Sequence, residues 1–272
     1  QGNITAYAYD EKGNLTSITD PTGATTQYQY DARGNVTKVV NPLGQTTTFG
    51  YDGQNNLISL TDPTGATTRF TYDASGNVTS QTDANGNTTR FEYDSSNRLI
   101  KVTDPAGNVT TFGYDKNGNR TSQTDANGNV TRYEYNSKGQ LIKVIDALGN
   151  VTTYAYGGSG CVTCGSGGEK LTSITDANGN TIRYEYDQLG RKIKETDALG
   201  NATLYSHDTK GNLLTKTDAN GHVTSFAYDP LGRVREQIDA LMGVMKSEYS
   251  PKGQVTKVTD ALGNATTYEY DA

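Results

Sequence analysis

The sequence predicts an all-β protein made of tandem hairpins. Three observations predict this fold: a repeat of 21 residues, a turn signal every ten or eleven residues, and short segments rich in Thr, Val, Ile, Leu and Tyr between the turns. Tyrosines followed by aspartate mark the period, each 21 residues after the last, at Tyr9, Tyr30, Tyr51, Tyr72, Tyr93 and Tyr114. We therefore expect residues 1–272 to form one array of about twelve repeats.

Each repeat contains two copies of the turn pattern D-x-x-G-N. Counted from its tyrosine as position zero, Gly falls at +4 and +14, and Asp or Asn at +11. The aspartate accepts local backbone N–H bonds, and the glycine three residues later adopts a positive φ. Asn55 and Asn97 replace Gly at +4, and Asn tolerates the left-handed region. Met242 at +14 fits poorly and predicts a distorted turn. The glycines expected to be structural sites include Gly34, Gly76, Gly86 and Gly107.

The aromatic residues fall in two columns, at position zero and two residues earlier. These columns hold 19 Tyr and 5 Phe, and the chain has no Trp. A spacing of two places both rings on one face of a strand. The residue between them is mostly small or polar, so this strand has an aromatic face and a wet face. We expect the tyrosines to be packing sites and mostly buried. They are represented by Tyr30, Tyr51, Tyr72, Tyr93 and Tyr114.

A period of 21 is odd, whereas side chains alternate along a strand with a period of two. An odd repeat can keep its tyrosine on one face only if the alternation is interrupted once per repeat. We therefore expect one β-bulge or asymmetric turn in every repeat, at the Gly-Asn positions.

Twelve repeats give about 24 strands, more than the ~10 that an open twisted sheet accommodates before it curls or splits. Only 33% of residues are hydrophobic, which argues against a solid sandwich of this size. The sequence thus predicts a spiralling antiparallel β-ribbon, a segment of a hollow β-shell. A closed small barrel or a flat solenoid is the alternative.

Composition excludes several classes of function. The net charge is −6, with charges of both signs interspersed, whereas a nucleic-acid surface needs clustered Lys and Arg. The longest apolar stretch, 240–245, is too short to span a bilayer. We expect no nucleic-acid partner and no membrane span.

A Gly- and Ser-rich insertion at 157–168 interrupts the period and holds Cys161 and Cys164. Cys-x-x-Cys supplies only half of a four-ligand zinc site. A local disulfide or an inert loop, a metal site completed by a second chain, and a redox pair are the three interpretations. We favour the first and expect no metal.

The sequence contains no motif that groups candidate catalytic residues. His207 occupies the tyrosine column, and His222 replaces the usual Asn after a turn glycine. No Ser, His and Asp set stands apart from the repeat, and no phosphate-binding loop follows a strand. The D-x-x-G-N pattern matches neither the EF-hand nor the β-roll calcium motif. We expect no enzyme activity and no cofactor.

The repeat Y-D-x-x-G-N-L-T-x-V-T-D-x-x-G-N-x-T-x-Y-x-Y-D, carried for example by 9–31 and 93–115, resembles the RHS/YD-repeat family. Members of that family build hollow β-shells that enclose a C-terminal toxin domain in bacterial polymorphic toxins and insecticidal toxin complexes. Related shells occur in teneurin adhesion proteins. The resemblance implies a wall segment, secreted or on the cell surface of a bacterium, whose partners are an enclosed toxin or effector domain and other segments of the shell. No self-cleavage segment and no effector domain are expected within these residues.

Two functions therefore remain: a structural shell wall, and a glycan-binding or adhesion module that uses exposed aromatic faces. The wall predicts that the rings are mostly buried, whereas stacking on sugars needs them open to solvent. Accessibility of Tyr72, Tyr93 and Tyr114 discriminates between the two. Open ribbon ends also lead us to expect end-to-end self-association.

Overall fold

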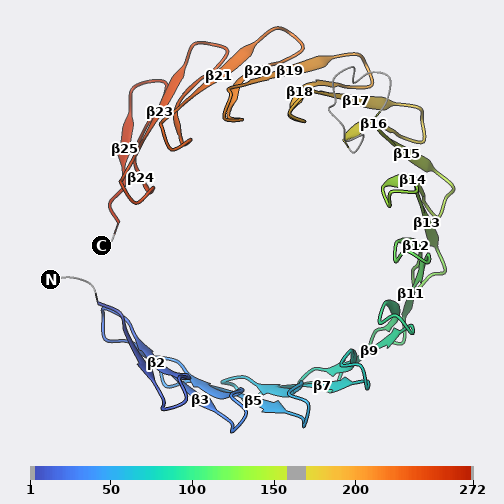
Figure 1. Cartoon of the computed structure of the whole chain (residues 1–272), viewed down its shortest axis with the longest axis vertical. Coiled ribbons are helices and arrows are strands. Elements are labelled where there is room, and N and C mark those ends of the chain that lie inside the picture. The colour runs from blue at the N-terminus through green and yellow to red at the C-terminus, as the bar shows by residue number, and fades with distance from the viewer. Residues whose placement is uncertain (1–3, 158–169, 271–272) are drawn as a thin grey trace. The chain divides into compact units, whose positions relative to one another are not determined.

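The structure is a computed structural model that describes residues 4–157 and 170–270. Within those residues there are 25 strands joined by turns and no helix, so the predicted all-β fold of tandem hairpins is confirmed. The chain, whose strands are labelled in Figure 1, divides into two compact units by its contacts, one ending at Arg132 and the other beginning at Tyr133. The boundary falls inside strand β13 (Val130–Tyr135).

Twelve strands precede β13 in the first unit. They are β1 (Ala6–Tyr9), β2 (Leu15–Thr19), β3 (Thr25–Tyr30), β4 (Val36–Val40), β5 (Thr46–Tyr51), β6 (Leu57–Thr61), β7 (Thr67–Tyr72), β8 (Val78–Thr82), β9 (Thr88–Tyr93), β10 (Leu99–Thr103), β11 (Val109–Tyr114) and β12 (Arg120–Thr124).

Twelve strands follow β13 in the second unit. They are β14 (Leu141–Ile145), β15 (Val151–Tyr156), β16 (Leu171–Thr175), β17 (Thr181–Tyr186), β18 (Lys192–Thr196), β19 (Ala202–His207), β20 (Leu213–Thr217), β21 (Val223–Tyr228), β22 (Val234–Ile238), β23 (Val244–Tyr249), β24 (Val255–Thr259) and β25 (Ala265–Thr267).

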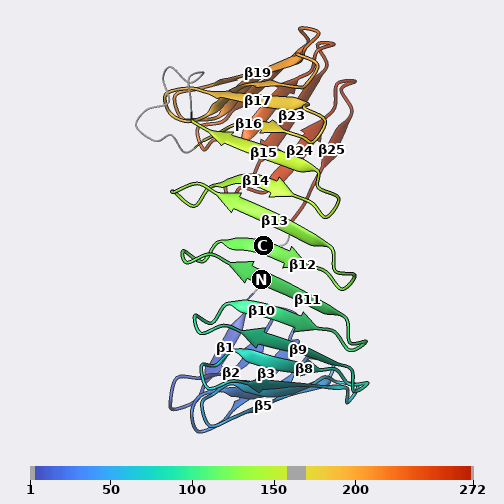
Figure 2. The ribbon, with the colours of Figure 1, turned by 90° about the vertical axis from the view of Figure 1, so that its right-hand side faces the viewer.

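Within each unit, consecutive strands pair antiparallel, as β9, β10 and β11 do. Figure 2 shows β8–β12 side by side, with turns at both ends of the strands. The turns at +1 to +5 lie along one edge of a unit, here called the first-turn edge. The turns at +11 to +15 lie along the opposite edge, the second-turn edge. In the described residues β1 pairs only with β2 and β25 only with β24, so neither unit closes into a small barrel.

One register shift per repeat resolves the odd period. Tyr114 pairs with Arg120, but the preceding Gly113 pairs with Ser122, so Thr121 is an extra residue in β12. The predicted bulge is therefore present, but it lies at +7 and not at the Gly-Asn positions. The Gly-Asn positions instead close an asymmetric three-residue loop in both turns: Gly118 N–H donates to Asp115 O, and Asp115 N–H donates to Asn119 O.

The strand registers also advance by two residues in each repeat. Phe91, two residues before its tyrosine, pairs with Val102, and Val102 pairs with Thr110, which lies four residues before the next tyrosine. Because this shift is even, every aromatic pair stays on the same face of the ribbon. Successive rings are therefore staggered along a diagonal and do not stand directly opposite one another.

The turn with Met242 is regular, so the distortion expected there is wrong. Met242 takes a φ of 66° in place of the usual glycine and donates its N–H to Asp239 O over 3.0 Å, as the turn glycines do. Gly243 replaces Asn at the next position. A Cβ at Gly243 would lie 2.6 Å from an Asp239 carboxylate oxygen and 3.0 Å from the Cβ of Ala261.

No side chain among the described residues is fully buried, hydrophobic or polar. Tyr72, Tyr93 and Tyr114 are only partly exposed, so most of each residue is covered, as expected, although none is fully buried. A single-layered ribbon has no second sheet to cover its aromatic face, and each ring is covered only by neighbouring hairpins. Tyr7 and Tyr9, which precede all other hairpins, are accordingly 57% and 61% exposed.

The predicted insertion at 157–168, with Cys161 and Cys164, lies outside the described residues apart from Gly157. The strands on both sides of it keep the register of the other repeats. Tyr156 pairs with Leu171, and Gly157 N–H donates to Lys170 O over 3.1 Å, the bond that closes every first turn. In the part of the chain that is described, no helix has the length and apolar character to cross a membrane.

Candidate functional site: the turn and tyrosine ladders

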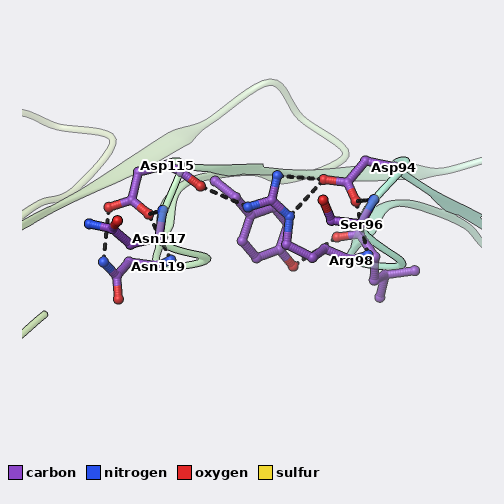
Figure 3. Close-up of polar contacts among 8 residues, drawn as sticks. Asp94, Ser96, Arg98, Asp115, Asn117 and Asn119 are labelled. Atoms are coloured by element: carbon purple, nitrogen blue, oxygen red, sulfur yellow. Dashed lines mark hydrogen bonds and ion pairs between the residues drawn. The ribbon is translucent and has the colours of Figure 1, made fainter.

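The candidate site is a set of contacts repeated along the ribbon, and its first part is the turn aspartate. Asp115 Oδ1 accepts the backbone N–H groups of Asn117 and Asn119, each over 2.9 Å (Figure 3). Its Oδ2 accepts the side-chain amide of Asn119 over 2.9 Å. The carboxylate thus satisfies backbone donors that the tight loop leaves without a strand partner, which explains the D-x-x-G-N spacing.

These bonds favour the ionised carboxylate. The hydrogen bond from the Asn119 side chain, followed by those from backbone N–H groups, holds the pKa of Asp115 below its ordinary value against the opposing effect of desolvation. The same causes lower the pKa of Asp83 and Asp104 in second turns. The aspartates therefore stabilise the turns in their charged form.

Asn can replace Asp in a turn when its partner changes too. Asn41 Oδ1 accepts the backbone N–H groups of Leu43 and Gln45, while Asn41 Nδ2 donates to Gln45 Oε1 over 2.8 Å. Asn136 and Gln140 repeat this pairing. The side-chain donor and acceptor have exchanged places, and the turn is unchanged.

The second part is a hydroxyl bond from seven tyrosines at position zero to the preceding repeat. Tyr114 donates its hydroxyl to the backbone carbonyl of Leu99 over 2.8 Å. Leu99 lies fifteen residues earlier and next to the bulge of β10, where pairing with β11 stops at Lys101. The tyrosine therefore satisfies a carbonyl that the bulge removes from the ladder. Equivalent bonds are made by Tyr30, Tyr51, Tyr72, Tyr186, Tyr228 and Tyr249.

The tyrosine rings lie against the preceding first turn. Desolvation, and then the negative charge of Asp52, raise the pKa of Tyr72, and Asp73 acts in the same way on Tyr93. Tyr93 is half-buried like its neighbours, but no hydrogen bond of its hydroxyl is found in the described residues. The raised pKa of each tyrosine therefore reflects contact of its ring with the preceding repeat.

The third part is an arginine that links neighbouring first turns. Arg98 replaces the usual Asn at +5 and donates Nε to Asp94 Oδ2 over 2.7 Å, while its NH1 donates to the backbone carbonyl of Asp115 over 2.7 Å (Figure 3). Its guanidinium lies 4.9 Å from the centre of the Tyr114 ring. Arg233 makes the same contacts with Asp229, Ser250 and Tyr249.

Asn at +4 has a comparable linking role in addition to adopting the left-handed conformation. Asn97 has a φ of 60° and accepts the side-chain amide of Asn77, from the preceding repeat, over 2.9 Å. Asn55 and Asn35 form the same pair. A glycine at this position has no side chain to accept that bond.

The wet face carries cross-strand ion pairs. Glu92, between its two aromatic residues, meets Lys101 directly across the strand pair, with 2.7 Å between Oε1 and Nζ. Glu185 with Lys194 and Glu248 with Lys257 repeat the arrangement. These pairs are half exposed, so each contributes about 0–1 kcal/mol.

The residues selected from the sequence occupy these ladders. Tyr30, Tyr51, Tyr72 and Tyr114 make the hydroxyl bond. Gly86 and the other selected turn glycines have φ between 85° and 89°. The sequence reasoning missed the role of the tyrosine hydroxyl and that of Arg98. The signal available for the arginine was its recurrence at +5, in place of Asn, at Arg98, Arg191 and Arg233.

Each of the two histidines takes the place of a usual repeat residue. His207 stands in the tyrosine column, where its buried Nδ1 has no hydrogen-bond partner in the described residues. His222 Nδ1 lies 2.9 Å from Asp218 Oδ2, in place of the usual turn asparagine. Within residues 4–157 and 170–270, no three His, Cys, Asp or Glu side chains gather as metal ligands would.

The fold is similar to that of solved chains from Tc toxin complexes. A crystal structure of TcdB2-TccC3-TEV superposes with a TM-score of 0.72 at 18% sequence identity, covering 95% of this chain and 15% of that chain. A Photorhabdus luminescens Tc holotoxin pore structure, with the mutation TccC3-D651A, gives a TM-score of 0.60 at 16% identity, covering 99% of this chain and 19% of that chain. The chain therefore spans less than a fifth of the length of these two solved chains.

No curated protein matches the sequence significantly. The family described as RHS Repeat matches residues 1–163, 168–202, 207–241 and 249–272, through overlapping segments that follow the 21-residue period. Since these matches cover nearly the whole sequence, the chain belongs to the RHS repeat family.

Proposed function

We propose that this chain is a wall segment of an RHS shell that encloses or displays a toxin or effector domain. The observation that carries the proposal is the interlocking of repeats. Each tyrosine hydroxyl that bonds a carbonyl fifteen residues earlier attaches one hairpin to the hairpin before it. A continuous, single-layered wall needs such lateral contacts because it has no core.

The chemistry of the described side chains supports a structural role. Aspartates, tyrosines and arginines that could act as acids, bases or anion ligands are engaged with backbone groups of the wall itself, as Arg98 and Tyr114 are. The similarity to chains of Tc toxin complexes supports enclosure of a toxin and release outside a bacterial cell. We propose no catalysis by this segment.

The half-buried rings give the glycan-binding alternative little support. Stacking on a sugar needs ring faces that are open to solvent. Tyr72 and Tyr114 instead face the preceding hairpin and donate their hydroxyls to its backbone carbonyls. Neither of the two similar solved structures is described as glycan-binding.

Limited proteolysis of the full-length protein that carries this segment tests the proposal. An intact wall should protect the enclosed domain, and a Tyr72→Ala/Tyr114→Ala variant should expose it to cleavage. The matched control is Ser75→Ala/Ser96→Ala, which removes two exposed hydroxyls at turn tips. Equal cleavage of the cargo in the parent protein and in the tyrosine variant, with the wall itself still folded by circular dichroism, would contradict enclosure.

A further inference from the structure

The two edges of the second unit differ in charge. Its second-turn edge carries six aspartates, in the turns that begin at 146, 176, 197, 218, 239 and 260, and no Lys or Arg. On its first-turn edge, the five turns that are described in full carry five cations and three aspartates, and they begin at 136, 187, 208, 229 and 250. Lys170, at the end of the turn that begins at 157, is a further cation on this edge. Lys138, Lys210 and Lys252 stand exposed at the tips of that edge. One edge is therefore acidic and the other carries free positive charge.

Both edges also expose leucines at the tips of their turns. On the second-turn edge Leu199 and Leu241 are 87% and 91% exposed, as are Leu148 and Leu262 to a similar extent. On the first-turn edge Leu189 and Leu231 are 73% and 75% exposed. Exposed leucines at matched places in successive repeats are unlike the scattered single residues of an ordinary surface.

The turns themselves do not need these leucines. Asn178 and Asn220 hold the same position in neighbouring repeats and make the same backbone bonds to Asp176 and Asp218. Met242 extends the pattern, since it exposes 79% of its surface beside Leu241 while occupying a left-handed conformation that glycine fills elsewhere. Apolar side chains are thus placed where they add nothing to the packing of their own unit.

The spacing of the leucines is the same on the two edges. Leu189 and Leu231 are 42 residues apart, and so are Leu199 and Leu241, which corresponds to two repeats, or about 19 Å across four strands. Lys210 stands between the leucines of the first-turn edge, and Asp218 begins the turn between those of the second-turn edge. If one edge is laid along the other, leucine meets leucine at the same interval and lysine meets aspartate between them.

We propose that the second-turn edge of the second unit docks on the first-turn edge of the second unit in another copy of this chain. The contact is head to tail, because two different surfaces meet. Charge complementarity selects this arrangement over pairs of identical edges, because two second-turn edges would place six aspartates against six aspartates and two first-turn edges would place lysines against lysines. The leucines supply the apolar contacts between the charges.

Sedimentation velocity of the 272-residue chain at low ionic strength tests the proposal. We expect reversible association at protein concentrations of about 10–100 μM, because turn tips bury little area, and a loss of association as salt shortens the Debye length to about 3 Å at 1 M. A chain that stays monomeric over this concentration range at low salt overturns the proposal.

Variants of the two edges separate this contact from other modes of association. Lys210→Glu/Lys252→Glu alters the first-turn edge, and Leu199→Asn/Leu241→Asn converts two turns of the second-turn edge to the sequence that Asn178 and Asn220 already carry. Each variant alone should associate at least tenfold more weakly than the parent chain. Lys12→Glu and Leu43→Asn, the same changes in the first unit, should leave association unchanged. Equal weakening by these controls overturns the assignment.

Mixing the two edge variants tests the head-to-tail geometry. The first variant retains an intact second-turn edge, and the second retains an intact first-turn edge. An equimolar mixture should therefore form 1:1 dimers with the affinity of the parent contact and no larger species. Unfolding temperatures within about 2 °C of the parent chain verify that both variants are folded. A mixture that associates no better than its components overturns the proposal.

Discussion

At the scale of single residues, the tyrosine at position zero joins two hairpins through its ring and, in most repeats, through its hydroxyl. The ring contributes by half burial against the preceding turn, and the hydroxyl contributes by satisfying a carbonyl beside the bulge. The two contributions are separable because Tyr93 is placed like its neighbours, yet its hydroxyl bonds to nothing in the described residues. Half burial also lowers the cost expected for Tyr93→Ala from the ~3–5 kcal/mol of a fully buried ring to about 2 kcal/mol.

Tyr114→Phe removes only the hydroxyl. It should lower the free energy of unfolding by about 1 kcal/mol, because the carbonyl of Leu99 loses its donor. Tyr93→Phe is the matched control and should be close to neutral. Urea unfolding followed by circular dichroism measures both. Equal losses in the two variants would show that the hydroxyl bond contributes nothing specific.

His207→Tyr should stabilise the chain. The histidine leaves Nδ1 buried without a partner, whereas a tyrosine there would reach the carbonyl of Lys192, fifteen residues earlier, as tyrosines of other repeats do. We expect a gain of about 1 kcal/mol in the free energy of unfolding. His207→Phe separates ring packing from the hydroxyl bond. If it stabilises as much as His207→Tyr, the carbonyl bond is not the cause.

At the scale of strands and turns, most of the fold could be predicted from the sequence because the local signals recur twelve times. The D-x-x-G-N spacing specified the turns, and the odd period required an interruption of the alternation in every repeat. The position of the bulge at Thr121 could not be predicted, because apolar and polar residues alternate too irregularly along this strand to show where the alternation is interrupted. The regular turn at Met242 was also missed, since the backbone bonds of that turn overcome the preference of one residue.

Gly86→Val tests the turn backbone in isolation. Gly86 has a φ of 85°, and a Cβ there would meet nothing within 4 Å, so any loss comes from the conformation of the residue and not from a clash. We expect a loss of about 2 kcal/mol in the free energy of unfolding. Gly86→Asn is the matched variant and should lose less, because Asn55 and Asn97 adopt this conformation in the parent chain. A loss as large for Asn as for Val would contradict this reasoning. Thermal unfolding monitored by circular dichroism measures both variants.

At the scale of the whole molecule, stability is distributed over neighbouring repeats and not concentrated in a core. In each unit the strands contact the strands next to them in the chain, and no described side chain is fully buried. A repeat protein of this kind gains stability from the sum of its interfaces. Because the repeats make similar small contributions to the free energy of unfolding, a change that weakens every repeat lowers the stability of the whole chain.

Acid is such a change, because nearly every turn depends on an ionised aspartate. Hydrogen bonds lower the folded-state pKa of Asp31, Asp83, Asp125 and most other turn aspartates relative to the unfolded chain. A depressed pKa contributes stability that is present above the unfolded value, about 3.9, and is lost as pH falls through the folded value. The unfolding temperature should therefore change little between pH 7 and about pH 5 and fall steeply below about pH 4.

The chain itself supplies the control for this prediction. Asn41 with Gln45 and Asn136 with Gln140 build the same turn without a titrating group. Replacing the pairs 83/87, 104/108 and 125/129 by Asn and Gln should reduce the fall in unfolding temperature below pH 4 while leaving the value at pH 7 within a few degrees. Each carboxylate is partly exposed to solvent, so its own effect is small, and the response becomes measurable only because the turns are many. If the substituted chain loses stability in acid as steeply as the parent, protonation of the turn aspartates is not what opens the ribbon.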